Sequence, residues 1–168
     1  MILTFYGKGK GKTSAALGLA LRASGYGKKI LFAQFIKGSW RTGEDCSLAK
    51  IKGLTHRKFG IGFVLPSDDA GKKLKHKKAC RKGIAFVKSN AAGFDLVILD
   101  EILLAINYKF CNQEEILEII RQYNKIDFIL TGQPRIKKII DASDLVSEIK
   151  KIKHPFDCGV KAKRGIDY

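Results

Sequence analysis

The feature that most constrains this chain is a glycine- and lysine-rich loop between an apolar run and a helical pattern at its amino end. Residues 2–5 are apolar or β-branched, residues 7–11 read Gly-Lys-Gly-Lys-Gly, and Lys12 opens an alanine- and leucine-rich stretch. Glycines let backbone N–H groups point inward at phosphate oxygens, and a helix start adds unpaired donors and the positive end of its dipole. The pattern predicts a strand, a phosphate-binding loop and a helix over about residues 12–24.

We expect this loop to bind the phosphates of a nucleotide. Lys12 would neutralise phosphate charge, and the hydroxyl of Thr13 would bind Mg²⁺. Tyr6 stands where the usual G-x-x-x-x-G-K-[ST] motif has its first glycine, so the loop is shifted or tightened by one residue. A lysine-rich turn that merely links a strand to a helix is the alternative. The expected phosphate-binding residues are Gly7, Lys8, Gly9, Lys10, Gly11, Lys12, Thr13 and Ser14.

An acidic strand end is the second motif. Residues 95–100 form an apolar run that ends in Asp100 and is followed by Glu101. Parallel sheets place ligands at the carboxyl ends of their strands, where a phosphate-binding loop needs carboxylates for Mg²⁺ or its water shell. An apolar strand that ends in two acids is common by itself. Combined with the upstream loop, it predicts that Asp100 and Glu101 share a magnesium site with Thr13.

Strand and helix patterns alternate along the rest of the chain. Continuous apolar strands are typical of a sheet that helices cover on both faces. We therefore predict an α/β fold of the P-loop, RecA-like kind, with a mostly parallel sheet of five or six strands flanked by helices. Residues 36–47 are expected to form a loop. The remaining expected strands are 28–35, 55–59, 126–131 and 145–149, and the remaining expected helices are 67–90, 114–123 and 136–142.

Length and cysteine usage set the class of protein. A chain of 168 residues is expected to form one nucleotide-binding domain over residues 1–168 that buries roughly 70% of its unfolded surface. No apolar stretch approaches the roughly 20 residues that span a bilayer, and the short apolar start does not fit a signal peptide. The four cysteines form no C-x-x-C pair, so we expect reduced thiols in a cytoplasmic enzyme.

The formal net charge is +16, and seven Lys and Arg residues fall between Lys72 and Lys82. This run fits a helix whose other face is apolar. Its lysines form either a solvated surface or a docking site for an acidic partner. We do not expect nucleic acid there, because no aromatic residues alternate with the lysines to stack on bases. The expected apolar face consists of Cys80, Ile84, Val87 and Ala91.

Histidines and the closing segment receive simpler interpretations. His56 and His76 lie among lysines and are expected to be exposed. The closing segment, residues 153–168, contains His154 in a His-Pro-Phe-Asp sequence. We expect this segment to pack beside the site or at a subunit contact, with a surface extension as the alternative.

These segments together resemble the P-loop type of ATP:corrinoid adenosyltransferases, also called cob(I)alamin adenosyltransferases. The likeness covers nearly the whole chain. The shifted phosphate loop is itself similar to that family's GNGKGKT-type core, which this chain matches except at Lys8. The stretches that carry the likeness are YGKGKGKTSAALGLALRASGYGKK, QFIKGSWRTGE, GIGF, DLVILDE, LTG and VSEIKKIKHPFDCGVKAKRGIDY.

The resemblance implies transfer of the 5′-deoxyadenosyl group of ATP to the cobalt of a reduced corrinoid, either cobalamin or a precursor, with release of triphosphate. Cobalt(I) is itself a strong nucleophile, so no general base is needed. Lys10 and Lys12 would act as catalytic residues by stabilising charge on the leaving triphosphate. Thr13 and Glu101 would hold Mg²⁺, with Asp100 assisting through water.

Other roles also follow from the resemblance alone. Arg22 matches an arginine that contacts the nucleoside, although a solvent-facing helical arginine is the alternative. Phe63 matches a phenylalanine at the corrinoid face. The family further implies a homodimer and a flavodoxin-like electron donor, whose acidic surface the +16 charge would attract.

The chain differs from the family pattern at two motifs. It has Val64 and Leu65 where the family commonly has Thr-Trp, and Gln133 where the family has arginine. We expect these differences to affect corrinoid preference and rate more than ATP binding. Two other functions stay open at this point: an ATP-binding relative without transferase activity, and an ATP-dependent nucleic-acid module, which would show steep salt dependence and release ADP.

Overall fold

The computed structural model describes residues 1–38, 40, 42–65 and 67–166. Its centre is a six-stranded sheet in which every paired strand is parallel, in the order β3-β2-β4-β5-β1-β6. The parallel α/β fold predicted from the sequence is therefore confirmed, with six strands where five or six were expected. The strands are β1 (Ile2–Tyr6), β2 (Ile30–Gln34), β3 (Leu54–Lys58), β4 (Leu96–Asp100), β5 (Asp127–Gly132) and β6 (Leu145–Glu148).

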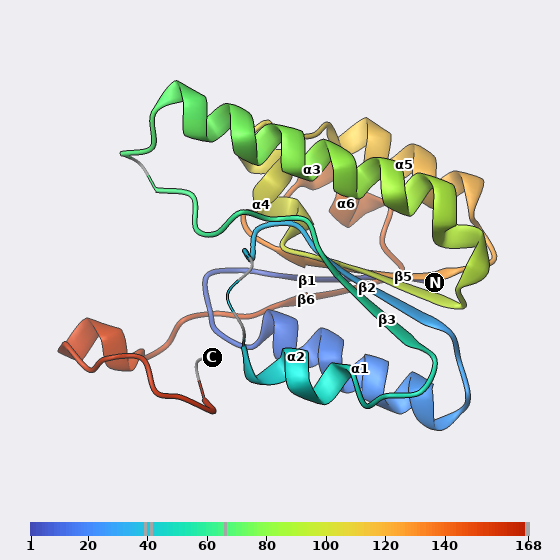
Figure 1. Ribbon diagram of the computed structural model, residues 1–168, viewed down its shortest axis with the longest axis horizontal. Coiled ribbons are helices and arrows are strands. Elements are labelled where there is room, and N and C mark those ends of the chain that lie inside the picture. Colours follow the sequence, from blue (N-terminus) through green and yellow to red (C-terminus); the bar gives the residue numbers. More distant parts are fainter. Residues whose placement is uncertain (39, 41, 66, 167–168) are drawn as a thin grey trace.

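Helices cover both faces of the sheet (Figure 1). One face carries α1 (Lys12–Gly25) and α2 (Gly43–Leu48). The chain also contains the 3₁₀ turns η1 (Ala91–Gly93) and η2 (Pro155–Cys158). Within the described residues, no helix is both long and apolar enough to cross a membrane. The opposite face carries α3 (Ala70–Asn90), α4 (Ile102–Asn107), α5 (Gln113–Gln122) and α6 (Lys137–Asp141).

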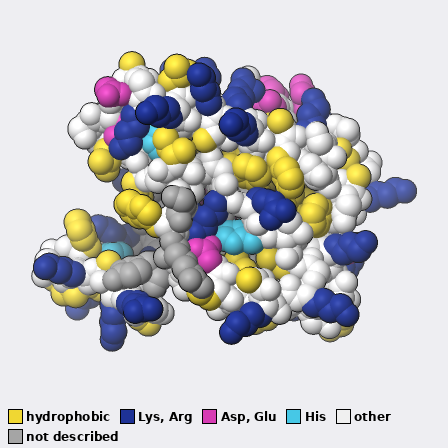
Figure 2. Space-filling view, in the orientation of Figure 1, with side chains coloured by type: hydrophobic (Ala, Val, Ile, Leu, Met, Phe, Trp, Pro, Cys, Tyr) yellow, Lys and Arg dark blue, Asp and Glu magenta, His cyan; other side chains and the backbone are white. Residues whose placement is uncertain are grey.

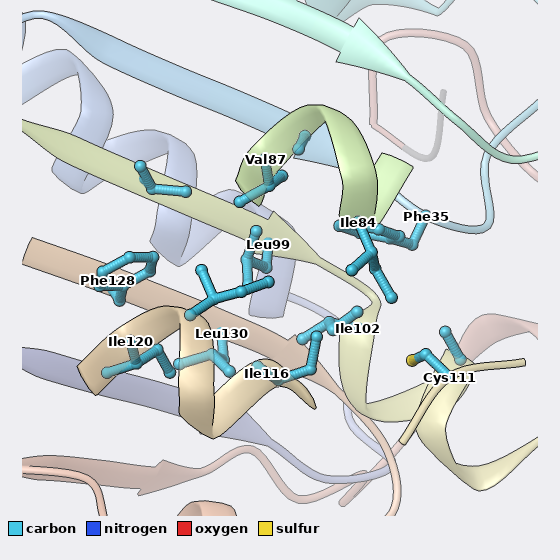
Figure 3. Close-up of a cluster of buried hydrophobic side chains, with 14 of the residues drawn as sticks. Phe35, Ile84, Val87, Leu99, Ile102, Cys111, Ile116, Ile120, Phe128 and Leu130 are labelled. Atoms are coloured by element: carbon cyan, nitrogen blue, oxygen red, sulfur yellow. The ribbon is translucent and has the colours of Figure 1, made fainter. Parts of the chain in front are cut away.

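The core is densest where the central strands meet α3, α4 and α5. All five residues of β2 and all five of β4 are buried, as expected for strands covered on both faces. Figure 3 shows Ile84 and Val87 of α3 above Leu99 of β4, with α5 packed nearby over β5. The apolar face predicted for the basic helix is confirmed, because its four members are at most 3% exposed.

Two short helices are absent from the sequence prediction. α2 and α4 have six residues each, which is too short to produce a helical repeat of apolar positions. α2 begins within the expected loop, extends one residue beyond it, and starts with a capping box formed by Thr42 and Asp45. α4 continues directly from Glu101 and buries Ile102 and Leu103.

The parallel arrangement brings the carboxyl ends of all six strands to one edge. The loops that follow β1, β2, β3 and β4 therefore gather there, on the side of the molecule from which the closing segment extends (Figure 1). Parallel α/β sheets bind their ligands at this edge.

Candidate nucleotide-binding site

The glycine-rich loop is held against the ends of β5 and β6. Gly7 donates its N–H to the carbonyl of Gly132 at 3.3 Å, and Gly9 donates to the carbonyl of Ile149 at 2.7 Å. A Cβ on Gly7 would lie 2.5 Å from the Ile149 oxygen, and one on Gly9 would lie 2.7 Å from it. Only glycine fits this close approach of two backbones.

Lys12 stands at the first residue of α1, directly behind the loop. Its side chain is buried, and its Nζ donates to the carbonyl oxygens of Gly7 and Gly9 at 2.9 Å each. Gly11 precedes the helix in the left-handed region, with φ 119°, and supplies no side-chain cap. The first amides of α1 therefore receive no cap from Gly11, which suits an anion at this helix end.

Asp100 lies fully buried beneath the loop and uses both carboxylate oxygens. Its Oδ1 accepts from the hydroxyls of Thr13 at 2.9 Å and Thr131 at 2.7 Å. Its Oδ2 accepts from Nε2 of Gln34 at 3.0 Å. The predicted proximity of Thr13 and the acidic end of β4 is thus present as a direct hydrogen bond.

Glu101 is the side chain best suited to a cation. Its Oε2 is buried and has no hydrogen-bond partner among the described residues. Burial, followed by the neighbouring charge of Asp100, raises the pKa of the Glu101 carboxyl above its ordinary value. Carboxylate and hydroxyl oxygens are the ligands that Mg²⁺ prefers, so Thr13, Asp100 and Glu101 fit that ion chemically.

A cavity of about 680 Å³ opens above these groups. Residues 8–14 and Glu101 line it. An ion pair between Lys37, in the loop after β2, and Glu44 of α2 also lines it. Phe63 and His154 are among the other lining residues. The cavity therefore combines a strongly cationic wall with two carboxylates.

Phe63 is 70% exposed at the mouth of this cavity. Trp40, itself 72% exposed, meets it edge to face with ring centroids 6.2 Å apart. The two aromatic rings provide an apolar surface beside a polar cavity. Trp40, Lys37 and Glu44 were not among the residues selected from the sequence, because their region has no motif beyond its resemblance to the family.

Three residues selected from the sequence do not line the cavity. Asp100 is buried next to Glu101, and Gly7 donates its N–H to the carbonyl of Gly132. Arg22 is ten residues beyond Lys12 on α1, which corresponds to about 15 Å along a helix. It lines a separate hollow with Tyr26 and Asp127 at the other edge of the sheet. The contact between Arg22 and the nucleoside stays a prediction.

The exposure predicted for two histidines is wrong. His76 is 2% exposed and its ring stacks on Phe110, with centroids 5.5 Å apart. The side chain of His56 is 15% exposed, and its Nε2 lies 2.8 Å from Oε1 of Gln34. Neighbouring lysines in the sequence misled the prediction, because successive side chains point in different directions from a helix or strand.

The closing segment lies beside the site but is largely exposed. His154 and Ile166 line the cavity, whereas Phe156 is 77% exposed. The surface-extension alternative thus describes most of its residues, and the expected position beside the site describes a few.

Comparison with known proteins identifies the family. The family described as ATP:corrinoid adenosyltransferase BtuR/CobO/CobP matches residues 1–168. This chain belongs to that family. It is similar to the corrinoid adenosyltransferase of Escherichia coli strain K12, with 37% identity over 171 residues that cover the whole chain and 85% of the relative.

Other relatives have similar names and coverage. The corrinoid adenosyltransferase CobA of Salmonella typhimurium is 36% identical and is covered over 85% of its length. The corrinoid adenosyltransferase of Pseudomonas aeruginosa is 30% identical and is covered over 83% of its length. In each case the match spans all of this chain.

The fold also resembles a solved structure outside the family. The flagellar accessory protein FlaH from Methanocaldococcus jannaschii aligns with a TM-score of 0.59 at 14% identity. The alignment covers 88% of this chain and 70% of FlaH. At that identity the similarity concerns the fold alone.

Proposed function

We propose that this protein transfers the 5′-deoxyadenosyl group of ATP to the cobalt of a reduced corrinoid and releases triphosphate. The observation that carries the proposal is the cavity in which a lysine-rich phosphate loop faces buried carboxylates, in a chain that matches the adenosyltransferase family over its whole length. This membership favours the transferase over the inactive relative and the nucleic-acid module.

In this reaction the protein would position ATP and the corrinoid and would stabilise the charge on the leaving triphosphate. The electron pair of cobalt(I) forms a bond to C5′ of ATP while the bond between C5′ and the triphosphate oxygen breaks, and triphosphate leaves with that electron pair. No proton has to be removed from the nucleophile. Lys10, Lys12 and the amides of residues 11–14 would stabilise the charge that gathers on the leaving group.

Lys12 would exchange its partners when ATP binds. Its two acceptors are now the carbonyls of Gly7 and Gly9, which belong to the loop itself. A phosphate oxygen is a stronger acceptor because it is charged. The ammonium group would therefore hold the loop in its bent form in the absence of a nucleotide and bind phosphate in its presence.

Thr13 and Glu101 would hold Mg²⁺, with Asp100 contributing through water or through its hydrogen bond to Thr13. The ion supplies positive charge to the leaving triphosphate when it is bound. The unpartnered Oε2 of Glu101 supports this assignment, because a buried carboxylate is costly until it is paired with a cation.

Phe63 would contact the corrinoid, since it is an exposed aromatic ring at the cavity mouth. The edge-on ring of Trp40 would enlarge that apolar surface, although Val64 and Leu65 supply no second aromatic residue. Corrinoid rings are broad and largely apolar on their faces, so they suit such a surface better than the lysine-lined wall.

The assembly and setting of the enzyme follow from the family resemblance. We propose a cytoplasmic homodimer that receives electrons from an acidic, flavodoxin-like donor. The net charge of +16 supports attraction of such a donor. Light scattering at a known protein concentration would test the dimer, and cross-linking of the purified donor would test the encounter.

The phosphate role is tested with Lys12→Ala. Purified protein is mixed with ATP, Mg²⁺ and chemically reduced cobalamin, and the absorption change of cobalt–carbon bond formation is followed. Loss of charged hydrogen bonds to phosphate should lower kcat/KM roughly 10- to 100-fold. Lys73→Ala, a change of equal charge on the exposed face of α3, should retain the wild-type rate. Equal rates for Lys12→Ala and wild type would refute the assignment.

A further inference from the structure

A series of polar side chains runs from Asp100, next to the cavity residue Glu101, toward α2. It begins at the buried Asp100, whose Oδ2 accepts from Gln34 at 3.0 Å. Oε1 of Gln34 then lies 2.8 Å from Nε2 of His56, on the edge strand β3. Nδ1 of His56 lies 3.5 Å from Oδ1 of Asp45, which belongs to α2. The series therefore crosses β4, β2 and β3 before it reaches the helix.

Sheet geometry explains why these groups meet. Gln34 and Asp100 are register partners on β2 and β4, so their side chains leave the sheet side by side. His56 is paired with Phe32, two residues before Gln34, and therefore points to the same face as Gln34. The rings of Phe32 and His56 are 5.4 Å apart, which keeps the imidazole against the sheet.

The hydrogen bonds between Asp100, Gln34 and Nε2 of His56 permit one arrangement. The Asp100 carboxylate accepts from the hydroxyls of Thr13 and Thr131, and the Gln34 amide directs its NH₂ group toward the other oxygen. The Gln34 carbonyl then faces His56, and Nε2 of His56 must carry the proton and donate it. The amide orientation and the imidazole tautomer are thus assigned from the network.

His56 holds the side-chain amide of Gln34 in one of its two orientations. An amide rotated by 180° would place its carbonyl against the Asp100 carboxylate and its NH₂ group against the N–H of His56. Both contacts would be repulsive. Burial, the largest effect, lowers the pKa of His56, and the nearby Asp45 carboxylate opposes that shift.

The other end of the series is anchored firmly. Oδ2 of Asp45 accepts from Nζ of Lys58 at 2.6 Å and from the amide of Thr42 at 2.7 Å. Lys58 also donates to the carbonyl of Trp40 at 2.8 Å. α2 contributes Glu44 to the cavity wall, so the segment that His56 faces is part of the site.

We propose that His56 is a positioning residue for the nucleotide site: it fixes the Gln34 amide, and through it the Asp100 carboxylate, in the orientation that serves the metal and phosphate groups. The proposal rests on the proposed function only in placing Mg²⁺ and ATP in this cavity. His56 itself does not line the cavity and does not touch the reacting atoms. Its effect must therefore appear as a change in how well magnesium supports nucleotide binding.

The test compares two replacements of His56. His56→Phe keeps an aromatic ring against Phe32 but removes the donor to Gln34. His56→Gln keeps a donor that can reach the same acceptor. Binding of a non-reactive ATP analogue is measured by calorimetry with Mg²⁺ and with EDTA, and thermal unfolding is recorded for each protein.

We expect Mg²⁺ to increase the affinity of the wild type for the analogue. In His56→Phe this increase should be smaller by about three- to tenfold, which is the effect of one lost hydrogen bond. Binding in EDTA should change by less than about twofold. His56→Gln should recover most of the magnesium effect. If His56 had a purely structural role, His56→Phe would weaken binding equally with Mg²⁺ and with EDTA, and His56→Gln would not restore it.

Three results would overturn the proposal: an unchanged magnesium effect in His56→Phe, equal losses in both variants, or no magnesium effect in wild type. If His56→Phe does not fold, His56→Leu removes the donor with a smaller side chain and is interpreted in the same way. Corrinoid is absent from these measurements. Failure of adenosyl transfer in a separate assay would therefore contradict the proposed function and would not contradict the inference about His56.

Discussion

Glu101 combines two unfavourable features at the centre of the site. Its backbone is left-handed, with φ 60°, and its buried Oε2 has no partner within the described part of the chain. Either feature costs free energy in an ordinary strand end. The hydrogen bond from its amide to Thr131 at 2.9 Å helps to hold the residue in this position. We interpret these costs as the consequence of directing a carboxylate toward a cation.

His76 makes the stability of the protein depend on pH. Burial lowers the pKa of its imidazole, with Lys72 acting in the same direction and Asp68, 3.8 Å away, opposing them. The unfolded chain therefore binds a proton more readily than the folded protein does. Stability from this group is complete above the ordinary histidine pKa of about 6.5 and is lost as the pH falls below it.

We predict that His76→Leu reduces this acid sensitivity. Urea unfolding is measured at pH 7.5 and at pH 5.5 for wild type and variant. Wild type should lose stability between the two values, and the variant should lose clearly less, because it has no proton to bind at that position. Identical losses would show that His76 does not contribute. Since Asp68 responds only at lower pH, it should not affect the comparison.

At the scale of elements, α3 packs tightly at Gly83 against aromatic rings that follow β2 and β3. A Cβ there would lie 2.7 Å from Cγ of Phe59 and 2.9 Å from Cε1 of Phe35. Neither contact involves the end of a flexible side chain. Gly18, on the exposed side of α1, has no atom within 4 Å of the same position. The two helical glycines thus differ in packing and share the same backbone conformation.

Alanine at these two glycines should have opposite effects. Gly18→Ala should stabilise the protein by about 0.5–1 kcal/mol, because alanine has the higher helix propensity. Gly83→Ala should destabilise it by about 1–3 kcal/mol, because overpacking outweighs that gain. Denaturant unfolding of both variants checks the signs. A stabilised Gly83→Ala protein would show that α3 can move away from the sheet without cost.

The main elements could be predicted because their local patterns are strong. The apolar strands at 95–100 and 126–131 and the apolar face of α3 required only the periods of strand and helix. α2 could not be predicted in this way, because six residues give no repeat. The contact between His56 and Gln34 depends on the pairing order β3-β2-β4, which no local pattern specifies.

The site was predictable to a similar degree. The loop and the acid pair carry recognisable motifs, so Thr13 and Asp100 could be placed together before their hydrogen bond was known. Arg22 shares a helix with Lys12, yet it lies at the other end of α1, where a resemblance in sequence does not establish proximity. Lys37 and Glu44 enter the site through tertiary packing that the sequence alone does not reveal.

At the scale of the whole molecule, Lys and Arg residues occur along most of the chain and give the net charge of +16. Figure 2 shows Lys and Arg side chains spread over one face, with hydrophobic and uncharged side chains between them. Such a distribution favours general attraction of acidic molecules over docking at a single basic groove. It is consistent with an acidic protein donor.

The six-stranded sheet also leads us to propose that residues 1–168 unfold as one domain. All strands belong to one sheet, and two apolar clusters cover its faces. Far-ultraviolet circular dichroism and the fluorescence of Trp40 should therefore give coincident transitions in urea. Separate transitions would indicate that part of the chain folds independently.

The most direct test of the account identifies the phosphate product. The protein is incubated with ATP, Mg²⁺ and chemically reduced cobalamin, and the nucleotide and phosphate products are separated by ion-exchange chromatography. The account predicts one triphosphate for each cobalt–carbon bond formed, because the nucleophile attacks C5′. Release of ADP and phosphate in place of triphosphate, or formation of no adenosylated corrinoid, would contradict it.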